Sequence, residues 1–154
     1  MAEDKIMSAR EIADAFRSAG FSIQGCSDHE VRELEQRLGH VLPRGYREFL
    51  LALGRDQGDF LKGSDLACDK VVCLQAEARS LLSDSGSSFR LVESQVVFVS
   101  HQGYQFLFID GAEGHDPPVW HYLEHDEEPK RVSESFSAWL VATLNEEAES
   151  LAKV

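Results

Sequence analysis

With 154 residues the sequence has the size of one domain, and such a chain can bury about two thirds of its unfolded surface without a metal or disulfide. Its 43% hydrophobic and 27% charged residues are near the globular average and argue against a disordered chain or a membrane-spanning one. The 15 basic and 27 acidic residues give a net charge of −12, which disfavours direct binding to nucleic acid and favours a basic protein partner.

The first third of the chain predicts three short amphipathic helices. Apolar residues recur at three- and four-residue spacing over 6–16, in a helix that ends near Gly20. A Ser-x-x-Glu capping box at 27–30 begins the second helix, and Gly39 closes it. The third helix is expected over 43–54, opened by a proline and ended by a glycine.

The middle of the chain gives weaker signals. Residues 55–64 are polar with two glycines and predict a loop, and 66–74 is expected to begin with a short strand. A helix over 76–82 then stops at the Ser/Gly-rich stretch 83–88, which predicts an exposed loop.

In the second half the helical spacing of apolar residues gives way to strand-like segments, which predict an antiparallel meander. The segments 96–100 and 104–109 are rich in β-branched and aromatic residues and form a hairpin, followed by a third strand at 119–123 and a short fourth at 131–132. Ser133 then caps a long amphipathic helix. The whole chain, 1–154, is thus expected to be one α+β domain, with N-terminal helices, an antiparallel β-meander and a long C-terminal helix.

The expected location is cytoplasmic. Residues 1–5 have no apolar core, which argues against a secretory signal. Cys26, Cys68 and Cys73 form no Cys-x-x-Cys pair and no even disulfide set, so reduced thiols are expected. Cys68 and Cys73 are further expected to be small buried apolar groups.

The negative charge is concentrated late in the chain and suggests a binding surface. From Asp110 to Glu149 there are eleven acidic residues against two basic ones, a balance of −9. Two acidic turns flank the third strand, and because turns join adjacent strands they are expected to lie at related edges of the sheet and to act together. The candidate contact residues are Asp110, Glu113, Asp116, Trp120, Tyr122, Glu124, Asp126, Glu127 and Glu128. Aromatic anchors surrounded by charge are typical of protein interfaces.

Two plainer readings of these residues stay open. The charge can serve solubility alone. The strand aromatics can all be buried under the long last helix, in which case none of them is an anchor.

Catalysis and metal binding find little support. Five residues within 115–125 could ligate a divalent metal, but a strand would turn their side chains to different faces, so no metal site is expected. No Gly-x-Ser-x-Gly elbow, Walker loop or Gly-x-Gly-x-x-Gly motif occurs. We therefore expect no cofactor and no enzymatic activity.

Several segments together resemble a known family. The second helix is followed by Leu-Pro at 42–43 and Tyr-x-x-Phe-Leu at 46–50, and later by Asp-Pro-Pro-Val at 116–119 and Ser-Phe-x-x-Trp-Leu at 135–140. This order resembles the SUKH superfamily of Smi/Knr-type domains, which comprises bacterial immunity proteins and fungal regulators of cell-wall synthesis. The resemblance spans roughly residues 31–144.

The resemblance implies a protein-binding domain. The leading function that it implies is that of an immunity protein, which neutralises a cognate toxin by direct contact. Such a toxin is often a nuclease with a basic active site. The alternative is a regulatory or scaffolding module that binds a cellular protein. The family supplies no fixed binding motif, so the candidate contact residues are argued from the charge and aromatic patterns of this sequence.

Overall fold

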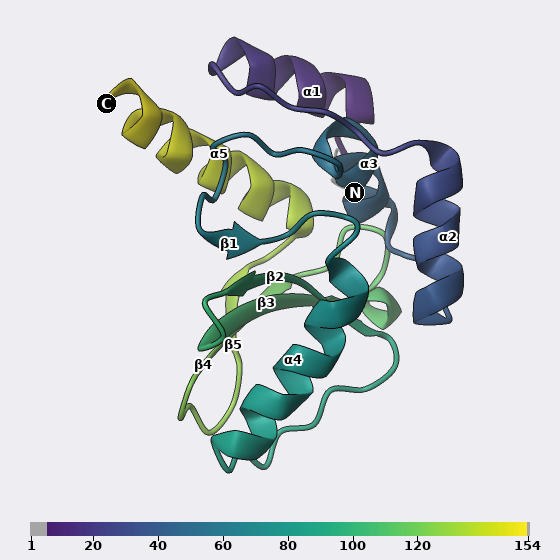
Figure 1. Cartoon of the computed structure of the whole chain (residues 1–154), viewed down its shortest axis with the longest axis vertical. Coiled ribbons are helices and arrows are strands. Elements are labelled where there is room, and N and C mark those ends of the chain that lie inside the picture. The colour runs from purple at the N-terminus through teal and green to yellow at the C-terminus, as the bar shows by residue number, and fades with distance from the viewer. Residues whose placement is uncertain (1–5, 154) are drawn as a thin grey trace.

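The computed structural model describes residues 6–153; residues 1–5, which carry the expectation about a secretory signal, and residue 154 lie outside the described residues. It is an α+β domain, as predicted, with helices around one antiparallel sheet (Figure 1). The helices are α1 (Ala9–Ser18), α2 (Asp28–Leu38), α3 (Arg44–Leu53), α4 (Val71–Asp84), the 3-10 turn η1 (Gly111–Glu113) and α5 (Phe136–Ala152). The strands are β1 (Ser64–Asp65), β2 (Gln95–His101), β3 (Gln105–Asp110), β4 (Val119–Leu123) and β5 (Lys130–Ser133).

Local signals define the N-terminal helices. The predicted capping box is present, because the Ser27 hydroxyl accepts from the Glu30 amide while the Glu30 carboxylate accepts from the Ser27 amide. A second box, between Ser8 and Glu11, begins α1 and was not recognised from the sequence. Gly39 ends α2 with a φ of 88°, a left-handed conformation that glycine adopts without a steric penalty.

The sheet is a five-stranded meander in the order β1-β2-β3-β4-β5, with every neighbouring pair antiparallel. The predicted hairpin and third strand are confirmed, and the short fourth strand is part of β5. The strand expected within 66–74 is wrong: the edge strand is Ser64–Asp65, and the following segment enters α4 at Val71. Two residues are too few to show an alternating pattern.

Helices cover both faces of the sheet. One face packs with α3 and α5 through Val96, Phe98, Ile109 and Val119. The other packs with α4 through Val97, Phe106, Phe108 and Tyr122. Figure 1 shows α4 lying apart from the group formed by α1, α3 and α5. The buried aromatics of β3 and β4, which are Phe106, Phe108 and Tyr122, therefore lie under α4. The reading in which all the strand aromatics are buried under the last helix is wrong.

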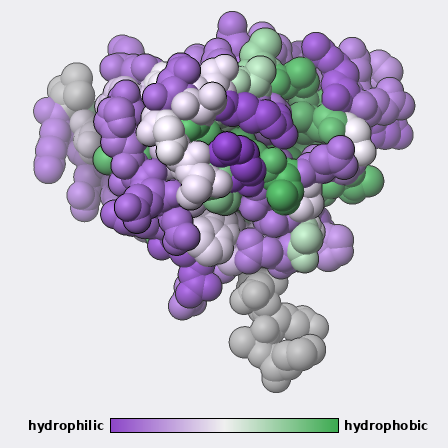
Figure 2. Space-filling view, turned by 90° about the horizontal axis from the view of Figure 1, so that it is seen from below, coloured by the Kyte–Doolittle hydropathy of each residue, from purple (hydrophilic) through white to green (hydrophobic). Residues whose placement is uncertain are grey.

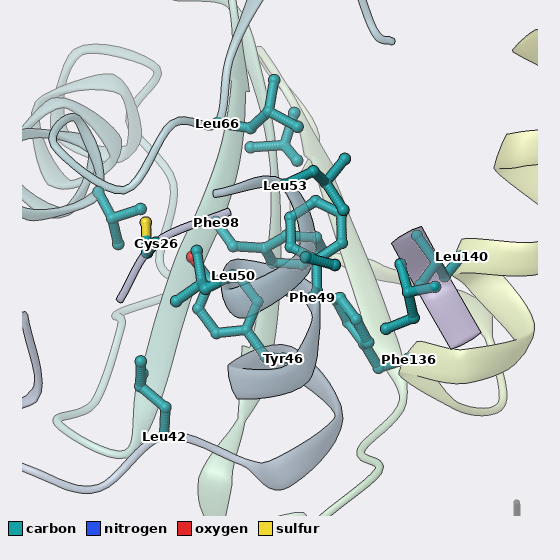
Figure 3. Close-up of a cluster of buried hydrophobic side chains, with 14 of the residues drawn as sticks. Cys26, Leu42, Tyr46, Phe49, Leu50, Leu53, Leu66, Phe98, Phe136 and Leu140 are labelled. Carbon is teal, nitrogen blue, oxygen red and sulfur yellow. The ribbon is translucent and has the colours of Figure 1, made fainter. Parts of the chain in front are cut away.

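The side chains that carry the family resemblance form the larger core. Tyr46 and Phe49 of α3 meet Phe136 of α5 with ring centroids 5.8 and 5.7 Å away (Figure 3). Phe98 of β2 lies edge-on to Trp139 at 5.1 Å, and Trp139 is only 8% exposed. These rings each bury a large apolar area and fix α3 and α5 on the sheet.

A side chain of α4 takes the place of a strand at the edge of β2. Gln75 Nε2 donates to the Val97 carbonyl at 2.7 Å, and the Val97 amide donates to Gln75 Oε1 at 3.0 Å. Because β1 pairs only with Ser100 and His101, these two bonds satisfy backbone groups that β1 does not reach.

The three cysteines are free thiols in different environments. Cys26 is buried, Cys68 is half-buried and Cys73 is exposed on α4, so the expectation that Cys73 is buried is wrong. A hydrogen bond with the Cys68 thiol, together with burial, raises the pKa of the Cys26 thiol.

Candidate functional site

The two acidic turns lie at opposite ends of β4. The connection with Asp110–Asp116 precedes Val119, and the turn with Glu124–Glu128 follows Leu123. The expectation that the two turns lie at related edges of the sheet is therefore wrong, and the expectation that they act together stays a prediction. Only individual side chains of the two acidic segments come together, and these are Glu113 and Glu128.

Asp116 serves the fold. Its Oδ1 accepts from the Ser137 amide in the first turn of α5 at 2.8 Å, while Oδ2 is buried without a hydrogen-bond partner among the described residues. A carboxylate at a helix N-terminus satisfies a free amide and complements the helix dipole. Asp116 is thus a helix-capping residue, and its carboxylate is engaged within the fold instead of being presented to a partner.

Two other acidic candidates shape their own turns. Asp110 Oδ1 accepts from the Ala112 amide at 2.9 Å and caps η1. Asp126 Oδ2 accepts from the Leu123 amide at 3.3 Å, in the turn where His125 has a φ of 73°. Both are half-buried, which leaves Glu113, Glu124 and the pair 127–128 as the exposed acidic candidates.

Tyr122 is not available as an anchor. It is fully buried and stacks on Phe106 with centroids 5.4 Å apart, in the cluster under α4. The candidate role of Tyr122 as an exposed contact is therefore wrong, because α4 covers the face of β4 to which it points. Trp120 lies on the same face but is only half-buried.

A pocket forms around Trp120, which we call the Trp120 pocket. Its volume is about 330 Å³. It is lined by Ser88, Phe89, Gln95, Phe108, Glu113, Trp120, Glu128 and Pro129. Three of the nine candidate residues, one from each side of β4 and one from β4 itself, thus meet in a single hollow.

The wall of the Trp120 pocket is a row of nearly parallel rings. Phe89 stacks on Phe108 with centroids 5.6 Å apart and planes at 29°, and Phe108 stacks on Trp120 at 6.4 Å and 15°. Trp120 Nε1 donates to Glu113 Oε1 at 3.1 Å, which fixes the indole and places a carboxylate at its edge. The site therefore combines an oriented aromatic surface with negative charge.

The two carboxylates of the Trp120 pocket form no ion pair with the described residues. Among residues 6–153, neither Glu113 nor Glu128 takes part in an ion pair, and no basic residue belongs to the pocket wall. Arg131 pairs with Trp120 across the strands but is exposed and lies outside that wall. A cation from outside the chain is favoured here.

Sequence reasoning missed Phe89, which supports the aromatic row. Phe89 follows the Ser/Gly-rich stretch 83–88, where only a surface loop was expected. Its amide donates to the Ser87 hydroxyl at 3.1 Å, which anchors the chain as it returns to the sheet. A single large apolar residue after a polar loop was the available signal.

A second hollow lies between α5 and the sheet, with a volume of about 410 Å³. His101 Nδ1 and Ser64 Oγ are 2.8 Å apart in its wall, as are His121 Nε2 and Gln105 Oε1. Burial lowers the pKa of His121 and so favours its neutral form. The histidines are held by neighbouring side chains, and within residues 6–153 no three metal-ligating groups come together.

Apolar side chains make up the smaller part of the face that Figure 2 shows. The face in Figure 2 is largely hydrophilic, and its hydrophobic residues gather together instead of spreading over the face. No helix among the described residues has the length and apolar character needed to cross a bilayer.

Comparison with known proteins gives one clear relationship. A search of curated proteins found no match. The family model described as SMI1 / KNR4 family (SUKH-1) matches residues 25–142, a segment that begins before α2 and extends into α5. Because this match covers well over half of the chain, the protein belongs to the SMI1/KNR4 (SUKH-1) family.

Proposed function

We propose that this domain is an immunity-type inhibitor that binds a basic toxin and blocks it by contact, without chemistry. Domains of this family are typically immunity proteins, and the net charge of −12 complements a basic partner. Toxins that act on nucleic acid carry basic surfaces because they hold phosphates, so an acidic inhibitor fits that class.

The observation that carries the proposal is the Trp120 pocket. It brings an oriented aromatic ring together with Glu113 and Glu128, and neither carboxylate has an ion-pair partner within the described chain. Binding energy at protein interfaces concentrates on a few aromatic and charged residues. Trp120 supplies a ring for desolvated contact, while the exposed carboxylates supply complementary charge.

The two parts of the site affect different steps. Exposed charges such as Glu127 and Glu128 raise the association rate and make it depend on salt. A ring that is desolvated on contact, such as Trp120, mainly sets the dissociation rate. The complex is therefore expected to form faster at low salt and to dissociate faster when Trp120 is truncated.

Co-expression with a candidate toxin encoded beside this gene tests the proposal. The domain should rescue cells from that toxin and form a complex with it in size-exclusion chromatography. The Glu127→Lys/Glu128→Lys variant should protect less well than wild type. Its matched control is Asp14→Lys/Glu77→Lys, which changes net charge equally at exposed positions on α1 and α4.

Lack of rescue and of complex formation by wild type would overturn the immunity proposal. The alternative function, a regulatory module that binds a cellular protein, predicts this result. Equal protection by the two double variants would instead show that contact lies away from the β4–β5 turn.

A further inference from the structure

The Trp120 pocket has the composition of a receptor for one cationic side chain. Its wall carries two carboxylates and no basic residue, and its rings are already aligned in the free chain. We propose that the Trp120 pocket binds an arginine side chain of the protein partner, with the guanidinium stacked on Trp120 between Glu113 and Glu128. This inference rests on the proposed function, because it takes the arginine to belong to that partner.

The ring of Trp120 provides the stacking surface. Phe108 occupies one face of the Trp120 indole, because the two rings stack with centroids 6.4 Å apart. Phe89 stacks in turn on Phe108. Trp120 nevertheless stays half-buried, so part of its side chain is open to the pocket. A planar guanidinium stacks on such a ring, and tryptophan is the strongest aromatic partner for a cation.

The carboxylates provide the charge and the orientation. Glu113 is held at the indole edge by the 3.1 Å bond from Trp120 Nε1, which leaves its second oxygen unused by any described hydrogen bond. Glu128 reaches the pocket from the β4–β5 turn. Guanidinium has five donors in a fixed plane and can meet two carboxylates at once, whereas an ammonium offers one compact charge.

The size of the hollow fits one side chain better than a larger ligand. About 330 Å³ lies at the lower end of the range for small-molecule pockets. No basic residue among 6–153 belongs to the wall: Arg131, the cross-strand neighbour of Trp120, lies outside it, and Arg90 Nη1 donates to the Ser87 and Phe89 carbonyls.

Nuclear magnetic resonance of the whole chain tests this directly, because the chain has two tryptophans and thus two indole N–H signals. N-acetyl-arginine amide should shift the Trp120 signal with a dissociation constant on the order of millimolar, as for a ligand of this size. The signal of Trp139 should stay in place, because that ring is in the other core cluster. The uncharged N-acetyl-citrulline amide should produce no shift, and N-acetyl-lysine amide should bind more weakly.

The variant Glu113→Gln/Glu128→Gln should weaken arginine binding at least about tenfold, with the amide spectrum showing that it is folded. Its control is Asp14→Asn/Glu77→Gln, which removes two exposed charges on α1 and α4, outside the pocket wall, and should bind arginine within about twofold of wild type. A citrulline shift equal to that of arginine, lysine binding as tight as arginine, or equal binding by both variants would overturn the inference.

Failure of this inference can be told apart from failure of the proposed function. If wild type rescues cells and the Glu113→Gln/Glu128→Gln variant holds the toxin with unchanged affinity, the arginine pocket is wrong and the immunity function stands. If arginine shifts Trp120 as expected but no rescue occurs, the proposed toxin partner is wrong and the binding chemistry stands.

Discussion

Replacing Asp116 distinguishes a helix-capping role from a contact role. Asp116 Oδ1 accepts from the Ser137 amide at 2.8 Å, and Ser135, not Ser133 as predicted, caps the next amide of the same turn. Removing a helix-capping side chain costs about 0.5–2 kcal/mol, and the carboxylate also complements the helix dipole. Burial of the unpartnered Oδ2 offsets part of that gain. We therefore expect Asp116→Ala to lower the free energy of unfolding by about 1–2 kcal/mol.

Urea denaturation followed by circular dichroism measures this loss. Asp116→Asn keeps an acceptor but loses the charge, so its stability should fall between wild type and Asp116→Ala. The control Glu127→Ala removes an exposed carboxylate and should change stability by less than about 0.5 kcal/mol. If Asp116→Ala costs no more than Glu127→Ala, the capping role is refuted, and Asp116 returns to the candidate contacts.

Three other predictions concern the fold. Trp139→Ala should cost about 3–5 kcal/mol in chemical denaturation because the ring is buried against Phe98, and a loss below about 1 kcal/mol would contradict that packing. Gln75→Leu should cost about 1–3 kcal/mol by leaving the Val97 backbone groups unpaired, and unchanged stability would show that they have other partners. In alkylation followed by mass spectrometry, exposed Cys73 should react first and buried Cys26 only on unfolding, since its pKa is raised; equal rates would refute this order.

Elements with local causes could be predicted from the sequence. The box of Ser27 and Glu30 involves residues three apart, and the left-handed glycine at Gly39 ends the same helix, so both signals are visible without tertiary structure. The β-branched and aromatic content of β2 and β3 identified the hairpin for the same reason.

Which helix packs on each face of the sheet could not be predicted from the sequence. That packing determines which candidate residues are buried and which are exposed. Alternation puts Trp120 and Tyr122 on one face of β4, but it does not say which helix packs there. Coverage by α4 buries Tyr122 completely and leaves Trp120 half-buried. Glu113 and Glu128 meet only because the segments before and after β4 both reach Trp120.

Asp116 shows a related limit. An acidic residue in a turn is most often solvated. The capping contact of Asp116 joins residues 21 positions apart, so no local sequence pattern indicates it. Charge counting therefore located the acidic region but could not separate residues that stabilise the fold from residues free to bind.

The central claim, that acidic residues beside Trp120 steer a basic partner to this surface, is tested most directly by the rate of association with the neighbouring-gene toxin at low and high salt. The account predicts that Glu127→Lys/Glu128→Lys slows association at least about tenfold at low salt, that the difference shrinks at high salt, and that Asp14→Lys/Glu77→Lys has a much smaller effect. Equal association rates for the two double variants at low salt would contradict it.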